Sequence, residues 1–431
     1  MRTRLLTFAR TLACAALLWA PVGLLASEPE PIWTHAKWSG GVGLEGDMIN
    51  PLSPAFLPTE KLERGLVGQI NIQFTRPKAG SSQGSYSATL LLYDGQRALT
   101  YRGRGPVLAH GSMENQSWVA KVPRAADAAI LVTLTRPLNS ASGHYLLGHV
   151  QLGSRQFPLF ALPAVFHARS NPLVEPSSTG RANFFVRDSM NTMGTGNGSA
   201  TISRGGAVRV SATLGDLRKL SLGSHVLRNP QGRLIVSVGR ALSGGGFFGG
   251  WWVFDPMDPE SHWRGSAFSA GSMAPLDILL AAHVPPARSA PVVSWDTGTI
   301  DLDAPQADGA LSRPASGDVK WTNPQRSRLR ALGTPSAVPL SPAAVFDPQG
   351  RLNGPNAFNV RLLSFVLNPS TGTASGKISY FFLISASSPA KVSTAAFKCA
   401  LNQKTGEIEG FVRPRYKGAS TGFLGIGPVG N

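Results

Sequence analysis

Apolar and polar residues alternate with a period of two along much of this chain. Tyr86, Ala88 and Leu90 are separated by serine and threonine, and Ile378, Tyr380, Phe382 and Ile384 also lie two residues apart. That period places one set of side chains on each face of a β-strand. Turn signals such as Asp94-Gly95 interrupt the pattern about every 8–12 residues. The sequence therefore predicts an all-β fold of two or three antiparallel β-barrel or β-sandwich units, with little helix.

The chain is organised around residues 244–254, in which five glycines and five aromatic residues leave room for only one valine. Glycine disfavours a helix here, whereas aromatic residues suit a pleated, half-buried surface. We predict a curved strand pair, with glycine where another backbone comes close. Neighbouring tryptophans on a strand point to opposite faces, so one of the two should face outward or into a second layer.

The aromatic side chains of this stretch have two possible roles. They could form a sugar-stacking platform, or they could pack in the core as large aromatics commonly do. The candidate binding residues are Phe247, Phe248, Trp251 and Trp252.

Short helices have weaker support in the sequence. Residues 59–66 could form one or two helical turns with Thr59 as N-cap. Residues 275–283 are the best short-helix candidate, although Ile278, Leu279 and Leu280 also fit a strand.

Proline-rich stretches at residues 170–180 and 334–342 suggest the domain boundaries. The predicted organisation is a signal peptide at 1–26, an irregular segment at 27–82, and three β units at 83–172, 173–333 and 334–431.

The first 26 residues predict a secretory signal. Arg2, Arg4 and Arg10 form a basic region, an apolar run follows, and Ala26-Ser27 offers small residues for cleavage. An uncleaved anchor and a lipoprotein signal at Cys14 are the alternatives. Pro21 interrupts the apolar run, and that run continues past Cys14. We expect a secreted, periplasmic or cell-surface protein whose mature chain has no transmembrane helix.

The chain is strongly basic, with a formal charge of +17. Removal of the signal, which holds three arginines and no acidic residue, would leave 405 residues and a charge of +14. Such an excess is compatible with anionic partners, such as an anionic polysaccharide or another envelope component, and no nucleic acid is expected. An ordinary solvated basic surface is the preferred alternative. Arg326, Arg328 and Arg330 would share one face of an extended strand. They could bind an anionic polymer or protect an edge strand from aggregation.

No motif of a known catalytic type is present, and we predict no catalytic residue, cofactor or metal ligand. His144 and His149 would lie on opposite faces of a strand. Asp301, Asp303 and Asp308 resemble a calcium loop only loosely, so a polar turn is the preferred interpretation. Cys399, the single cysteine of the mature chain, is expected at an ordinary buried strand position.

Several segments resemble glycine-rich, all-β repeat regions of large secreted or surface proteins from environmental bacteria. The short sequence 229–234 also recurs, nearly unchanged, at 347–352. The resemblance implies an extracellular or surface setting and carries no functional residue over to this chain. The segments that carry it are 196–214, 229–234, 244–254, 318–321, 406–410 and 422–425.

The leading functional hypothesis is a non-catalytic secreted or surface protein with a structural or binding role, directed toward an anionic polymer or polysaccharide. An extracellular carbohydrate-active enzyme, or its binding module, is one alternative. An outer-membrane β-barrel is another, which the absence of a terminal aromatic strand weakens.

Overall fold

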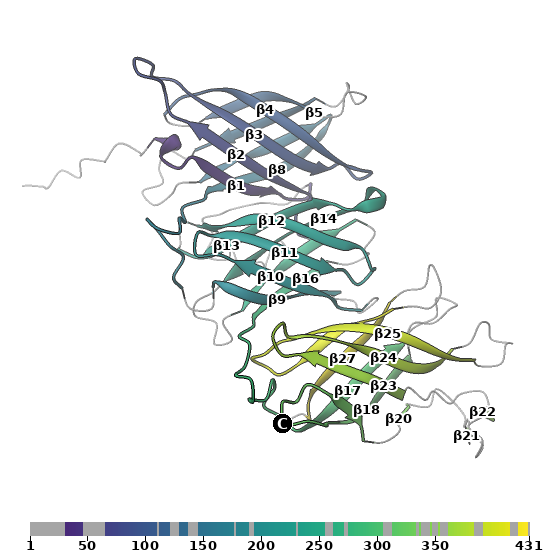
Figure 1. Cartoon of the computed structure of the whole chain (residues 1–431). Coiled ribbons are helices and arrows are strands. Elements are labelled where there is room, and N and C mark those ends of the chain that lie inside the picture. The colour runs from purple at the N-terminus through teal and green to yellow at the C-terminus, as the bar shows by residue number, and fades with distance from the viewer. Residues whose placement is uncertain are drawn as a thin grey trace, which may run out of the picture.

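The computed structural model shows three β-barrel units stacked in chain order (Figure 1). The described residues contain helix only as two 3₁₀ turns, η1 (Ile32–Thr34) and η2 (Ser243–Gly245). None of these helical segments has the length and hydrophobicity needed to cross a membrane. The prediction of an all-β fold with two or three barrel or sandwich units is confirmed. The structure describes residues 31–45, 65–109, 112–120, 129–136, 145–175, 178–188, 194–229, 232–254, 262–270, 275–304, 313–332, 336–337, 345–346, 352–353, 361–382, 391–413 and 421–429.

The first barrel is a closed antiparallel meander in which each strand pairs with the next and β8 pairs with β1. On β3, Tyr86, Ala88 and Leu90 point into the core, and the serines and threonine between them are exposed. The two-residue period therefore corresponds to the inside and outside of a barrel. Its strands are β1 (Lys37–Val42), β2 (Gly68–Thr75), β3 (Gly84–Tyr93), β4 (Ala98–Val107), β5 (Met113–Ala120), β6 (Ile130–Thr135), β7 (Leu146–Leu152) and β8 (Arg155–Pro163).

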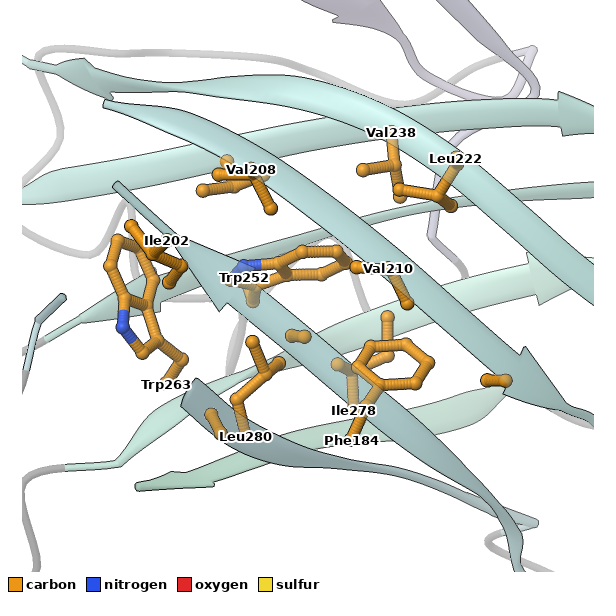
Figure 2. Close-up of a cluster of buried hydrophobic side chains, with 14 of the residues drawn as sticks. Phe184, Ile202, Val208, Val210, Leu222, Val238, Trp252, Trp263, Ile278 and Leu280 are labelled. Atoms are coloured by element: carbon orange, nitrogen blue, oxygen red, sulfur yellow. The ribbon is translucent and has the colours of Figure 1, made fainter. Parts of the chain in front are cut away.

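The second barrel has the same topology, and its last strand, β16, pairs with its first, β9. Figure 2 shows Trp252 and Trp263 among the aliphatic side chains that fill its interior, with Phe184 nearby. Its strands are β9 (Gly180–Asp188), β10 (Gly196–Ile202), β11 (Ala207–Thr213), β12 (Lys219–Arg228), β13 (Leu234–Ala241), β14 (Phe247–Phe254), β15 (Trp263–Ser269) and β16 (Leu276–Ala282).

The third unit is a nearly closed barrel, in the strand order β19-β18-β17-β27-β26-β25-β24-β23. A bridge between Arg328 and Val366 and a hydrogen bond from Leu367 N to Ser327 O (2.8 Å) connect its two ends. Its strands, with the outlying β20 and the hairpin β21–β22, are β17 (Thr297–Ala304), β18 (Arg313–Trp321), β19 (Leu329–Ala331), β20 (Ser336–Ala337), β21 (Val345–Phe346), β22 (Leu352–Asn353), β23 (Arg361–Asn368), β24 (Thr373–Phe382), β25 (Lys391–Leu401), β26 (Ile408–Val412) and β27 (Gly422–Pro428).

The first and second barrels join at a seam, here called the first seam, that is apolar and also hydrogen-bonded. Phe160 and Leu162 of the first barrel pack with Ile235, Trp251 and other outward residues of the second. The backbone N–H of Leu66 donates to the carbonyl of Gly249 (3.0 Å). Burial of these apolar faces stabilises the contact in the same way as a barrel core does.

The second and third barrels meet at a second seam, which is more polar. Arg187 forms a two-pronged ion pair with Glu409, with N–O distances of 2.8 and 2.6 Å. The buried Asn183 amide donates to Leu401 O (2.6 Å), and Phe185 packs in a small apolar cluster with Ala400. This seam removes backbone carbonyl and carboxylate groups from water. Side-chain amides donate hydrogen bonds to the carbonyls, and a bidentate guanidinium pairs with the carboxylate.

The unit boundaries differ from those predicted. The segment 27–82 supplies two barrel strands, β1 and β2, and the third unit begins with β17 instead of at residue 334. Strand β1 shows no alternation of buried and exposed residues, because five of its six residues are buried. One face of the strand lies in the barrel and the other in the first seam. The proline-rich stretch 334–342 does not mark a unit boundary in the sequence. Strands β17 and β18 precede it and β27 follows it, yet β17 pairs with both β18 and β27 in one sheet.

The helix prediction for residues 275–283 was wrong, since β16 runs from Leu276 to Ala282. Ile278 and Leu280 face the barrel core, while Leu279 and Ala281 face the second seam. Burial on both faces removes the polar positions that would have revealed a two-residue period. The other helix candidate, residues 59–66, and the predicted signal at 1–26 lie outside the described residues, apart from Gly65 and Leu66.

Candidate functional site

The aromatic stretch forms β14, and its side chains divide between two buried environments. Phe248 and Trp252 belong to the core of the second barrel, and Trp251 belongs to the first seam. Phe160 of β8 packs against Trp251 with ring centroids 5.2 Å apart, and Tyr93 stacks on Phe247 at 5.7 Å. The expectation that neighbouring tryptophans face opposite layers matches this arrangement.

The rings of Phe247, Phe248, Trp251 and Trp252 are all 0% exposed. In this structure none of them presents a face to a ligand in solvent, so the sugar-stacking platform has no exposed ring on which to form. Gly249 shows why this stretch needs a glycine, because a Cβ at this position would overlap the carbonyl oxygen of Leu66. The close backbone approach predicted for this stretch is therefore the contact that joins the two barrels.

The three arginines of the predicted basic row do not act together. Arg326 lies in a turn with φ 52°, and its guanidinium pairs with Asp296 (2.6 Å) and donates to Val293 O (2.8 Å). Only Arg328 and Arg330 lie on the extended segment, where both side chains are exposed. The row is thus reduced to two exposed cations at the short strand β19.

The other sequence candidates form no cluster in the described part of the chain. No group of three histidine, cysteine, aspartate or glutamate side chains that could hold a metal ion occurs among those residues. Asp301 lies on strand β17 and His149 on β7, whereas His144 and Asp308 lie outside the described residues. Cys399 is buried in the third barrel, as predicted, and burial raises the pKa of its thiol well above the ordinary range.

The largest cavity described is an open groove of about 880 Å³ on the outer face of the first barrel, here called the first groove. It crosses β1 to β5 and ends at the first seam, where His225 of the second barrel contributes to its wall. Its residues are Lys37, Trp38, Ser39, Asn71, Ile72, Gln73, Ser87, Ala88, Thr89, Arg102, Gly103, Arg104, Ser117, Val119, Ala164 and His225.

Strand register arranges the polar side chains of the first groove in two rows. The first row runs across the strands as Ser39, Asn71, Thr89, Arg102 and Val119. Ser39 Oγ donates to Asn71 Oδ1 (3.0 Å), which fixes the beginning of this row. The row offers hydroxyl and amide groups along most of its length and a guanidinium close to its end.

The second row lies one step along each strand and repeats this chemistry. Lys37 pairs in register with Gln73, Gln73 with Ser87, and Ser87 with Arg104. Outward residues two apart on a strand are about 7 Å apart, so the two rows form a strip of hydrogen-bonding groups.

The first groove carries unbalanced positive charge. Lys37, Arg102 and Arg104 line it, and its described lining contains no aspartate or glutamate. Within the described part of the chain, none of these three cationic groups pairs with a carboxylate. Their positive field is therefore directed at whatever enters the groove.

His225 contributes hydrogen-bonding capacity and no charge at neutral pH. Burial lowers the pKa of its imidazole, and the neighbouring Lys37 ammonium lowers it further. A neutral imidazole has one donor and one acceptor nitrogen. The charge in the groove thus comes from lysine and arginine over the ordinary pH range.

Sequence reasoning missed this groove. The alternation of Ser85, Ser87 and Thr89 revealed an outward polar face, but such a face is the ordinary exterior of a barrel. The register that places Lys37, Arg104 and His225 around one hollow joins strands far apart in the sequence.

No protein-family model and no curated protein matches the chain. Among solved structures, it is similar to the isotype 1 transferrin binding protein B from serogroup B Neisseria meningitidis. That comparison has 11% identity and a TM-score of 0.26, and it covers 91% of this chain and 75% of the other. A double mutant of transferrin binding protein B from Haemophilus parasuis Hp5 gives 10% identity and a TM-score of 0.23, with the same coverage. These scores are too low to bear on function.

Proposed function

We propose that this protein is a non-catalytic binding protein that acts outside the cytoplasm and holds an acidic polysaccharide in the first groove. The observation that carries the proposal is the combination of Lys37, Arg102 and Arg104 with two rows of neutral hydroxyl and amide groups. Arginine and lysine attract carboxylate or sulfate groups, and the neutral side chains suit the hydroxyls of sugar rings.

Among the described residues, no exposed aromatic ring lines the groove, which favours an acidic sugar chain over a neutral one. Trp38, the one aromatic residue in the described lining, is only 2% exposed. Neutral sugars need a ring face or a dense set of hydrogen bonds to replace the contacts they make with water. In this groove, charge supplies the part of the attraction that stacking would otherwise provide.

The barrel exteriors argue against the membrane-barrel alternative. Most outward positions of β2 to β4 carry asparagine, glutamine, serine, threonine or arginine, with Leu91 and Tyr93 among the exceptions, while the interior holds the apolar core. A barrel in lipid has an apolar outer band, so the pattern here is reversed.

Binding of polygalacturonate, a carboxylate polymer, tests the proposal, with neutral dextran as the comparison ligand. The double variant Arg102→Gln/Arg104→Gln should weaken binding about tenfold, since two exposed charge contacts contribute roughly 0.7 kcal/mol each. Both side chains are exposed and have no described partner, so the fold should persist. Affinity should also fall as salt rises.

The matched control is Arg328→Gln/Arg330→Gln, which removes the same charge from exposed positions in the third barrel. This control should bind polygalacturonate as the wild type does. Equal weakening by both double variants would mean that net charge alone attracts the polymer, and it would refute the groove. Single-stranded DNA binding as tightly as polygalacturonate would refute the polysaccharide assignment.

A further inference from the structure

The second barrel carries a smaller hollow, of about 520 Å³, on the outer faces of β10 to β12, here called the second groove, and Arg240 of β13 also lines it. Strand register again places polar side chains in rows, with Ser199, Ser211 and Ser221 forming one of them. Arg209 and Arg240 supply positive charge, and no acidic residue is among the described residues that line the hollow. Within the described residues neither arginine pairs with a carboxylate.

The two grooves occupy equivalent places in the two barrels. Each barrel is an eight-stranded meander closed by its first and last strands, so β9 corresponds to β1 and β12 to β4. The first groove crosses β1 to β5, and the second crosses β10 to β12. The corresponding face therefore carries the same chemistry, serine and threonine with exposed arginine, in both barrels.

Strand β12 connects the two grooves across the first seam. Ser221 and Gly223 line the second groove, and His225, the next outward residue of the same strand, lines the first. Outward residues two apart on a strand are separated by about 7 Å. Figure 1 shows β12 at the edge of the second barrel that faces the first barrel.

We infer that the first and second grooves form one binding path, so that the second groove is an additional binding site for the same acidic sugar chain. This inference rests on the proposed function of the first groove. A small anion could occupy either groove alone, whereas only a chain with regularly repeated charge can use Arg102 and Arg104 together with Arg209 and Arg240. Simultaneous contact with both grooves raises the affinity for long chains through effective concentration.

Chain length is the variable that tests this inference. Polygalacturonate and trigalacturonate should be compared as ligands, because the trimer is short enough for one groove. The double variant Arg209→Gln/Arg240→Gln should weaken binding of the polymer on the order of tenfold and leave binding of the trimer unchanged. The double variant Arg102→Gln/Arg104→Gln should weaken binding of both ligands.

Gly223 allows a second test at the junction between the grooves. A Cβ there would meet nothing closer than Val208 O at 3.7 Å, so a side chain can be accommodated. Gly223→Glu places a negative charge on the path and should weaken binding of polygalacturonate more than binding of trigalacturonate. Gly223→Ala should bind both ligands as the wild type does. Thermal unfolding of each variant checks that the fold is retained.

The two proposals fail in different ways. If Arg209→Gln/Arg240→Gln and Gly223→Glu both bind the polymer normally while Arg102→Gln/Arg104→Gln does not, the continuous path is overturned and the first groove remains. If Arg102→Gln/Arg104→Gln binds both ligands normally, the proposed function itself is overturned.

Discussion

Replacing Gln69 by glutamate should make the stability of the first seam depend on pH. Gln69 lies on β2 of the first barrel, is 7% exposed, and inserts its amide between β12 and β13 of the second barrel. Its Nε2 donates to Ser237 O (3.0 Å), and its Oε1 accepts from the backbone N–H of Gly239 (3.0 Å). The register of β12 and β13 ends at Val226 and Val236, and the amide bonds two backbone groups beyond that point. Ser237 O also accepts from Ser224 Oγ (2.6 Å), whereas the Gly239 N–H donates to the Gln69 oxygen.

A protonated glutamate side chain in the Gln69→Glu variant can reproduce both hydrogen bonds, because its O–H can donate to Ser237 O. A carboxylate can accept from Gly239 but cannot donate, and two oxygens would then face each other in a buried site. The folded-state pKa of the introduced carboxyl group should therefore lie above its unfolded value of about 4.3. The variant should match the wild type below about pH 4 and lose stability as pH rises through the folded-state pKa.

The expected loss at pH 7.5 is about 3 kcal/mol, which corresponds to a pKa raised by about two units. Gln69→Ala should lose about 2–3 kcal/mol at every pH, because it leaves the Gly239 N–H without a partner and has no group to titrate. The neighbouring imidazole of His225 is present in every variant, so its titration largely cancels in the differences between variants.

Urea unfolding followed by tryptophan fluorescence at pH 4 and pH 7.5 measures these differences, since Trp251 lies in the same seam. Gln83→Glu is the control, because Gln83 is exposed at the start of β3. A Gln69→Glu variant whose stability difference from the wild type is the same at both pH values would refute the reasoning.

Two further predictions concern packing. Gly40→Ala should destabilise the first barrel by about 2–3 kcal/mol in urea unfolding, because its Cβ would overlap a carbonyl oxygen of β8; Gly427→Ala, where the nearest atom is 3.7 Å away, is the control, and equal losses would contradict the reasoning. The thiol of Cys399 should not react with Ellman's reagent at pH 8 in the folded protein and should react fully in denaturant, since burial raises its pKa; rapid reaction of the folded protein would show that the site opens.

The sequence was sufficient to predict strands that have one buried face and one solvent-exposed face. Strand β3 is the clearest case, because every second residue is accessible to water and several of those residues are serine or threonine. It was insufficient for β1 and β16, which are buried on both faces because another barrel covers their outer side. Those strands read as apolar or glycine-rich runs, and such a run does not by itself distinguish a strand from a helix.

The candidate site was less predictable than the fold. The basic composition indicated an anionic partner, but it could not show which of the 41 lysines and arginines remain unpaired. Arg326 illustrates the difficulty: its spacing placed it with Arg328 and Arg330, yet a turn directs it onto Asp296. Register and long-range pairing decide which cations share a surface, and neither can be deduced from local spacing.

The first seam links the stability of the protein to the proposed binding path. The single strand β12 contributes Ser224 to the hydrogen bonds around Gln69 and His225 to the first groove, so two consecutive residues serve the seam and the site. An isolated first barrel would lack His225, and its groove would end without the continuation onto the second barrel. Loosening the seam in Gln69→Glu should therefore weaken the binding of long acidic chains over the same pH range in which stability falls. Trigalacturonate, which needs only the first groove, should be affected much less.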